Sequence, residues 1–169
     1  MDREVPEGRG LIHHADRFPP LPPERADLWS NFGRWETVYF PSVVGIGLEE
    51  VRVDYARMRL AFRPELNQPA GVVHGGAIAT LIDTVVVPAV GSAYDVFMNM
   101  LTIDLQIRYL GAAVRTDLVA EGWVNRRGRS ILFCQAEVRA VDTGDVVAEG
   151  WLTYKVSAPR TGAPTIGAT

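Results

Sequence analysis

Apolar residues follow two different spacings along this chain, and the change between them locates the secondary structure. Residues 75–91 are apolar at nearly every position, which predicts one long buried helix that ends near Gly91 or Ser92. Stretches rich in β-branched residues predict strands on both sides of it, at residues 43–53, 55–63, 98–110, 117–126, 130–141 and 146–156. This order of elements is an α+β pattern, and so apolar a helix needs a curved antiparallel sheet wrapped around it.

Two details of this pattern give sharper predictions. Pro88 falls inside the helix, where it lacks an N–H donor and crowds the preceding turn, so we expect a kink or an early end at residues 84–88. In residues 101–109 apolar and polar side chains alternate. We therefore expect Leu101, Ile103 and the later odd-numbered residues to share one face of the strand, with Thr102 and the even-numbered residues on the other.

The first forty residues have no strand pattern. Residues 1–23 hold five of the eleven prolines, which predicts an extended arm in which His13 and His14 are exposed to solvent. Large apolar residues then recur every three or four positions, which predicts a short amphipathic helix within residues 23–38. That helix either packs on the core or covers a substrate pocket as a lid. The chain thus divides into an arm with a short helix (residues 1–41), a main domain (42–156) and a flexible tail (157–169).

Composition and charge narrow the class of protein. A chain of 169 residues that is 47% hydrophobic fits one domain with a sizeable core. A net charge of −3 gives no reason to expect binding to nucleic acid or to an anionic membrane. With neither a signal peptide nor a membrane-length apolar run visible, we expect a cytoplasmic protein. The single cysteine, Cys134, follows a strand alternation and is expected to be a packed core thiol.

The candidate chemistry concentrates at the start of the predicted helix. His74 precedes Gly75 and Gly76, and Asp83 follows His74 by nine residues on an otherwise apolar helix. Burying a carboxylate without partners is costly, so a protein that keeps one there usually uses it. The helix start also offers free backbone N–H groups. Together they suit attack on a carbonyl, with the N–H groups holding the oxyanion and the carboxylate activating water or attacking. The alternative is a purely structural helix in which Asp83 is paired.

These residues carry a resemblance to a known family. They follow the pattern Asn, then Gly-x-x-His-Gly-Gly, then Asp nine residues after the His, at Asn67, Gly71, His74, Gly75, Gly76 and Asp83. This pattern resembles the signature of hotdog-fold acyl-CoA thioesterases of the phenylacetate-pathway (PaaI) type. The likeness spans residues 42–156 and includes a strand with Thr102 and Asp104. It implies the hotdog fold, in which a curved antiparallel sheet wraps around a central long helix, here with an N-terminal helical extension.

The resemblance also implies roles for these residues. Asp83 would act on the thioester carbonyl as general base or nucleophile, and the N–H of Gly76, or that of Gly75, would polarise the carbonyl. Thr102 would orient Asp83 or the nucleophile, although Thr is also ordinary strand content.

Asn67 and His74 would position the water or the leaving thiolate, although His74 could serve only as a helix cap. One residue more than the usual spacing separates the two, so Gln68 could take the place of Asn67. No metal and no cofactor is implied.

The remaining expectations concern substrate and partners. Arg127, Arg129 and Ser130 lie in a turn that matches the family, and arginines suit the phosphates of CoA because a guanidinium donates two parallel hydrogen bonds. The alternative is a solvated hairpin tip. The family places its active site between two subunits, which implies a homodimer, or two dimers joined as a homotetramer.

The sequence therefore predicts an acyl-CoA thioesterase that hydrolyses a thioester to CoA and a carboxylic acid. Two other functions stay open. One is a hotdog enoyl-CoA hydratase or dehydratase, although this chain lacks a second active-site acid where those enzymes have one. The other is a non-catalytic acyl-CoA sensor, although the first residues show neither a helix-turn-helix pattern nor a basic run. The pattern ranks neither an aromatic nor a fatty acyl group first.

Overall fold

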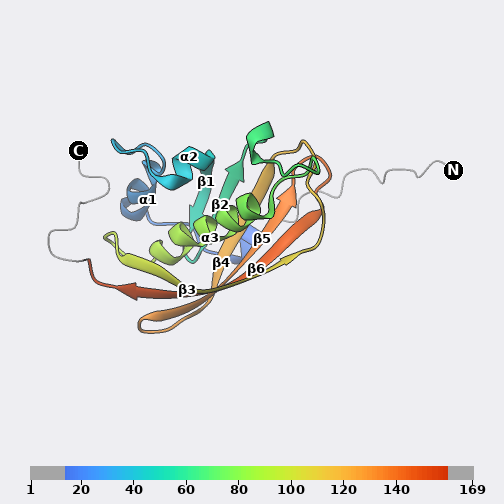
Figure 1. Ribbon diagram of the computed structural model, residues 1–169. Helices are drawn as coiled ribbons and strands as arrows, with labels where there is room; N and C mark the ends of the chain where they lie inside the picture. The colour runs from blue at the N-terminus through green and yellow to red at the C-terminus, as the bar shows by residue number, and fades with distance from the viewer. Residues whose placement is uncertain (1–13, 160–169) are drawn as a thin grey trace.

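One long helix lies across the concave face of a curved six-stranded sheet in the computed structural model, which describes residues 14–159 (Figure 1). All neighbouring strands are antiparallel, in the order β1-β2-β4-β5-β6-β3. The strands are β1 (Ile46–Arg52), β2 (Tyr55–Leu60), β3 (Asn99–Tyr109), β4 (Leu118–Arg127), β5 (Ile131–Ala140) and β6 (Val146–Ser157). The α+β architecture predicted from the sequence is confirmed, and the prediction for His13 lies outside the described residues.

The long helix, α3 (Gly75–Gly91), forms the centre of the core. Its side chains Leu81, Ile82, Val85 and Val86 are fully buried against the sheet. The close approach depends on Gly122 of β4, since a methyl group there would lie only 2.8 Å from Val85 Cγ1. The expected early end of the helix is wrong. The helix continues through Pro88 to Gly91, because burial of almost every side chain in this part of α3 offsets the cost of the proline.

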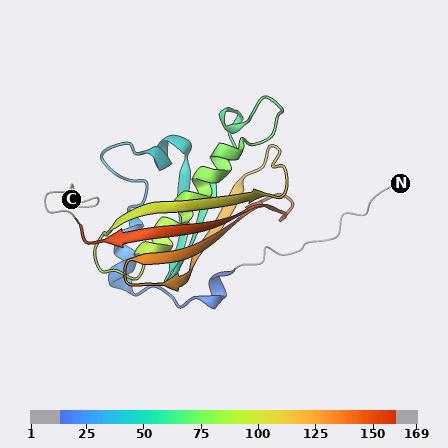
Figure 2. The ribbon, with the colours of Figure 1, turned by 60° about the horizontal axis from the view of Figure 1, so that its bottom comes forward.

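A β-bulge changes the faces of β3. The pairing of β3 with β6 shifts register between Thr102 and Asp104. The predicted alternation is therefore wrong across this point, because one extra residue reverses which face the following side chains occupy. Thr102 contacts the helix, whereas Leu101 and Ile103 are 63% and 57% exposed. Beyond the bulge, Leu105 and Ile107 pack inward on the core. Figure 2 shows β3 beside β6 at the edge of the sheet.

The N-terminal segment passes from one face of the sheet to the other. A 3-10 helix, η1 (His14–Arg17), covers the outer face, and the chain then pairs with the end of β1 through Pro20 and Arg52. Next come α1 (Pro23–Ser30) and α2 (Phe40–Val44), which lie on the side of the sheet that holds α3 (Figure 1). The single helix expected within residues 23–38 is thus shorter, because a turn at residues 31–33 ends it.

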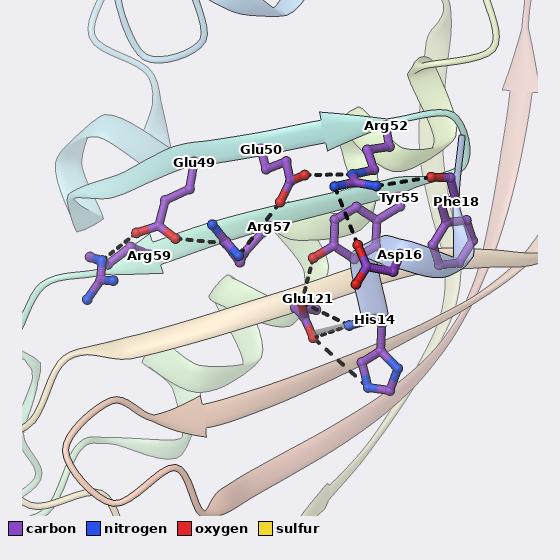
Figure 3. A network of polar contacts seen from close by, with 10 residues as sticks. All are labelled: His14, Asp16, Phe18, Glu49, Glu50, Arg52, Tyr55, Arg57, Arg59 and Glu121. Atoms are coloured by element: carbon purple, nitrogen blue, oxygen red, sulfur yellow. Dashed lines mark hydrogen bonds and ion pairs between the residues drawn. The ribbon is translucent and has the colours of Figure 1, made fainter. Parts of the chain in front are cut away.

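Polar contacts fasten η1 to the outer face of the sheet (Figure 3). The backbone N–H of His14 lies 3.3 Å from both carboxylate oxygens of Glu121, and the Tyr55 hydroxyl donates to the same carboxylate at 2.5 Å. The His14 ring also packs on Trp123, with ring centroids 4.5 Å apart. The prediction that His14 is solvent-exposed is therefore wrong, since its side chain is only 19% exposed.

Candidate active site

Asp83 occupies the middle of α3, where its half-buried carboxylate meets two hydroxyl groups from the sheet. Thr102 of β3 donates to Asp83 Oδ1 at 2.8 Å. The Tyr154 hydroxyl of β6 lies 2.9 Å from the same oxygen and 2.8 Å from the backbone carbonyl of Asp83. Burial raises the pKa of Tyr154 far above its ordinary value, so its hydroxyl keeps its proton and remains a donor. Two fixed donors thus hold the carboxylate in one orientation.

The sequence alone did not suggest Tyr154 as a site residue. It lies directly across from Thr102 in the register of β3 with β6, a pairing between residues far apart in the chain. The usable signal was the inward alternation of Leu152, Tyr154 and Val156, which placed a hydroxyl within an otherwise apolar row. Since a buried tyrosine hydroxyl needs a hydrogen-bond partner, the carboxylate on the central helix was the natural candidate.

The start of α3 is held by a cap and by a tyrosine. His74 caps the helix, and its Nδ1 accepts the Gly76 N–H at 2.8 Å. Tyr109, near the end of β3, donates through its hydroxyl to the Gly75 carbonyl at 2.9 Å. Among the described residues the Gly75 N–H meets no acceptor. Gly75 therefore offers the free donor at this helix start, whereas the Gly76 N–H is already engaged.

The loop before the helix brings Asn67 beside the cap. Asn67 bridges to Val73, and the His74 N–H donates to the Leu66 carbonyl at 2.8 Å. Gln68, the alternative considered from the sequence, is exposed in the turn that follows. The Asn67 Oδ1 atom is buried and has no hydrogen-bond partner among the described residues. Of the two amides, Asn67 is thus the one that the loop turns inward.

The Asp83 carboxylate and the start of α3, where Asn67 and His74 lie, do not meet within one chain. Nine residues of α-helix separate His74 from Asp83, which corresponds to roughly 13 Å along the helix axis. A single thioester carbonyl cannot reach both the carboxylate and the helix start at that separation. One chain therefore holds two halves of the expected site, near opposite ends of β3.

A cavity of about 490 Å³ opens beside Asp83, within the range of small-molecule pockets. Its lining is mainly apolar and aromatic, and much of it comes from the N-terminal segment. The lining residues are Leu28, Trp29, Asn31, Phe32, Trp35, Tyr39, Phe40, Pro41, Asp83, Thr84, Val87, Phe97, Met98, Asn99 and Met100. Trp29 of α1 packs on α3, so the packing role expected from the sequence is confirmed, and residues around α1 also line this cavity.

The turn between β4 and β5 contains two arginines that differ in their contacts: Arg127 is bound by protein groups and Arg129 is exposed. Arg127 donates to the Asp54 carboxylate through Nη2 and to the Val90 carbonyl at 3.0 Å, and its guanidinium lies over the Tyr94 ring. These contacts use the groups that were expected to meet a phosphate. Arg129 is exposed, with no protein contact among those described, and Ser130 beside it is exposed as well. Strand register puts this turn at the end of the sheet that carries Thr102.

One group in the described chain has the spacing of a metal site, and it lies on the other face of the sheet from Asp83. Nitrogen and oxygen atoms of His14, Glu121 and Glu137 lie within 4.8 Å of one another. Tyr55 already donates to Glu121, and Arg139 pairs with Glu137 at 2.6 Å. We assign this group to the attachment of η1 rather than to catalysis.

A curved sheet around one helix, with a helix-borne carboxylate in the lining of an apolar cavity, defines a hotdog-fold protein with a candidate hydrolytic site. A family model described as Thioesterase superfamily matches residues 70–147, which include the helix start and Asp83. A Halobacterium salinarum protein named as a candidate esterase is 37% identical over 125 residues, covering 68% of this chain and 82% of that protein. The chain belongs to the thioesterase superfamily, a family of thioester hydrolases.

Solved structures bear out the hotdog fold. A conserved protein of Pseudomonas aeruginosa superposes with a TM-score of 0.67 at 27% identity, over 72% of this chain and 95% of that one. The E. coli PaaI protein from the phenylacetic acid degradation operon superposes with a TM-score of 0.70 at 17% identity, over 79% and 96% of the two chains. None of the helices described here is long and apolar enough to cross a bilayer.

Proposed function

We propose that this protein hydrolyses acyl-CoA thioesters to CoA and a carboxylic acid, with Asp83 as the reacting carboxylate. The observation that carries the proposal is the position of Asp83. Its carboxylate is oriented by Thr102 and Tyr154, and it lines an apolar cavity. An acyl group in that cavity would present its thioester carbonyl to the carboxylate.

The proposed reaction needs a donor for the carbonyl oxygen as well as a base. Asp83 takes a proton from water, and the water oxygen adds to the carbonyl carbon. The Gly75 N–H of a second subunit holds the resulting oxyanion, with the helix dipole in support. The carbon–sulfur bond then breaks, and the CoA sulfur leaves with the proton that Asp83 had accepted. In the alternative route Asp83 attacks the carbonyl itself, and solvent oxygen-18 entering the Asp83 side chain during a single turnover would identify that route.

The edge strand β3 offers a way to bring the two halves of the site together. Thr102 holds Asp83 near one end of β3, and Tyr109 holds Gly75 at the other. If two copies pair antiparallel about a point between Leu105 and Gln106 of β3, Thr102 of one copy lies opposite Tyr109 of the partner subunit. The carboxylate of each chain then approaches the helix start of the other. We therefore propose a homodimer with two shared sites, and pairing of dimers into a tetramer as a further step.

The phosphates of CoA are proposed to meet Arg129 and Ser130. Both are exposed in the β4–β5 turn, at the end of the sheet where Thr102 holds Asp83. Arg127 is left out of this proposal because Asp54 and Val90 already hold its guanidinium.

A panel of acyl-CoA substrates, with the released thiol detected by a disulfide reagent, tests the activity. We expect hydrolysis by the native chain and almost none by Asp83→Asn, because an amide keeps the size and hydrogen bonds of the carboxylate but cannot accept the proton. Near-native turnover by a folded Asp83→Asn protein would refute the assignment. An enoyl-CoA in the panel, followed through its conjugated double bond, distinguishes hydration from hydrolysis.

Mixed dimers test the shared site. Asp83→Asn subunits lack the base, and Asn67→Ala subunits alter the loop beside the helix start. After subunit exchange, a heterodimer would retain one site with both halves intact, so part of the lost activity should return. No recovery despite proven exchange would mean that each site lies within one chain or that Asn67 has no part in it.

A further inference from the structure

The cavity beside Asp83 runs in one direction along α3. The helix residues that line it are Asp83, Thr84 and Val87, and none lies N-terminal to Asp83. The cavity therefore extends from the carboxylate towards the C-terminal end of the helix, away from the oxyanion donors. An acyl chain whose carbonyl sits at Asp83 would follow this direction.

Trp29 of α1 stands at the far end of this path. Its side chain is buried, with 5% of its surface exposed, and it meets α3 at Gly91. The contact is so close that a methyl group on Gly91 would lie 2.3 Å from Trp29 Cζ2. Phe97 supports the indole edge-to-face, with ring centroids 5.3 Å apart. The indole is thus fixed against the helix two turns beyond Asp83.

The rise of α3 per residue gives the length of the space between Asp83 and Trp29. Eight residues separate Asp83 from Gly91, which is about 12 Å along the axis. Van der Waals contact with the indole takes up roughly 3.5 Å of this length. An extended chain advances roughly 1.3 Å per bond, judged from the 3.8 Å between successive Cα atoms three bonds apart. About six or seven carbon–carbon bonds therefore fit, which corresponds to an acyl group of seven or eight carbons, so octanoyl reaches the limit and hexanoyl lies below it.

We propose that Trp29, which lies outside residues 70–147 matched by the family, sets the length limit of the acyl group. The substrates are thioesters of uncharged, medium-length acyl groups, and longer chains are excluded by the indole. Among the described residues that line the cavity Asp83 is the only charged one, so a second carboxylate on the acyl chain would find no cationic partner among them. This inference rests on the proposed thioesterase function and deepens it.

Specificity constants across butanoyl-, hexanoyl-, octanoyl-, dodecanoyl- and hexadecanoyl-CoA test the limit. The native chain should prefer hexanoyl or octanoyl. Trp29→Leu keeps an apolar side chain but removes the indole, so the ratio of dodecanoyl to octanoyl kcat/KM should rise about tenfold, the gain expected from two more buried methylene groups. Val87→Phe fills the middle of the path and should move the preference towards butanoyl, which keeps the proposal testable if Trp29→Leu does not fold.

Trp151→Leu is the matched control. This half-buried tryptophan lies on β6, packs against Arg108 and does not line the cavity. Its replacement should leave the length profile unchanged. A native preference for hexadecanoyl, an unchanged profile in folded Trp29→Leu, or an equal change in Trp151→Leu would overturn the role of Trp29. If no thioester is hydrolysed, the proposed function fails, and calorimetric binding of the free carboxylic acids to the same variants then tests the length limit by itself.

Discussion

Replacing Tyr154 with phenylalanine tests whether the orientation of Asp83 matters for turnover. The ring of Tyr154 is 2% exposed, so phenylalanine retains its packing and removes only the hydroxyl. That hydroxyl contacts both Asp83 Oδ1 and the Asp83 backbone carbonyl. Since the raised pKa of Tyr154 keeps it protonated, the lost donor is the same at every pH used for the assay.

The size of the effect follows from the kind of bond that is lost. A hydrogen bond to a charged group contributes about 1.5–3 kcal/mol, and a half-buried carboxylate with a second donor should lie at the lower end. We expect kcat to fall about tenfold, which corresponds to roughly 1.4 kcal/mol of transition-state stabilisation. KM should change by less than about twofold, because the acyl group does not depend on this hydroxyl for binding. Thiol release from octanoyl-CoA measures both constants.

Tyr55→Phe provides the matched control for this substitution. Tyr55 is fully buried and also donates to a carboxylate, that of Glu121, but on the outer face of the sheet. Both variants should lose about 1–2 kcal/mol of stability, or roughly 2–8 °C in Tm. Only Tyr154→Phe should lose kcat. Unchanged kcat in a folded Tyr154→Phe protein would show that the hydroxyl is purely structural, and an equal loss in Tyr55→Phe would point to general loosening of the sheet.

Three further predictions follow from the packing. Gly122→Ala should lower stability by about 1–3 kcal/mol, because its methyl group meets Val85 at 2.8 Å. Gly47→Ala should leave stability unchanged, because a methyl group at Gly47 would meet no described atom within 4 Å. Thermal unfolding of the two variants compares their stability. Cys134 should not react with a disulfide reagent at pH 8 in the folded protein, since burial raises the pKa of its thiol to about 12; rapid native labelling would contradict this. Arg129→Ala should raise KM for acyl-CoA but not for a pantetheine thioester. Arg127→Ala should instead lower Tm and change KM equally for the two substrates.

The sequence predicted the helix, the strands and the carboxylate because these depend on local spacing. Asp83 and His74 could be singled out because each interrupts an apolar or glycine-rich run. Tyr154 could be recognised only as a hydroxyl in an inward-facing row, because its position opposite Thr102 depends on cross-strand register. Tyr109 could not be singled out, because its role comes from a contact with the start of α3. The predicted free donor also depended on a rotamer, since the His74 ring turned back onto the Gly76 N–H.

Two other differences between sequence and structure have the same origin. A β-bulge arises from one unpaired residue, and the alternation of residues 101–109 did not indicate that a bulge follows Thr102. The position of Trp29 required the chain to pass around the sheet and reach Gly91, a contact between residues more than sixty positions apart. Periodicity identified Trp29 as apolar and helical, but only the fold shows which surface it meets.

The passage of the N-terminal segment around β1 limits how many neighbours the sheet can accept. Pro19 and Pro20 pair with the end of β1, and residues of α1 line a common pocket with the middle of β1, so within the described residues the chain itself flanks this edge. At the opposite edge, no strand of the described part of the chain pairs with the outer side of β3. A sheet with two open edges could add copies without end and grow into a filament, whereas a sheet with one can be joined only once. If two copies join through β3 as proposed, the N-terminal segment would keep the other edge of each sheet from pairing, so its removal should convert the proposed dimer into a species that aggregates.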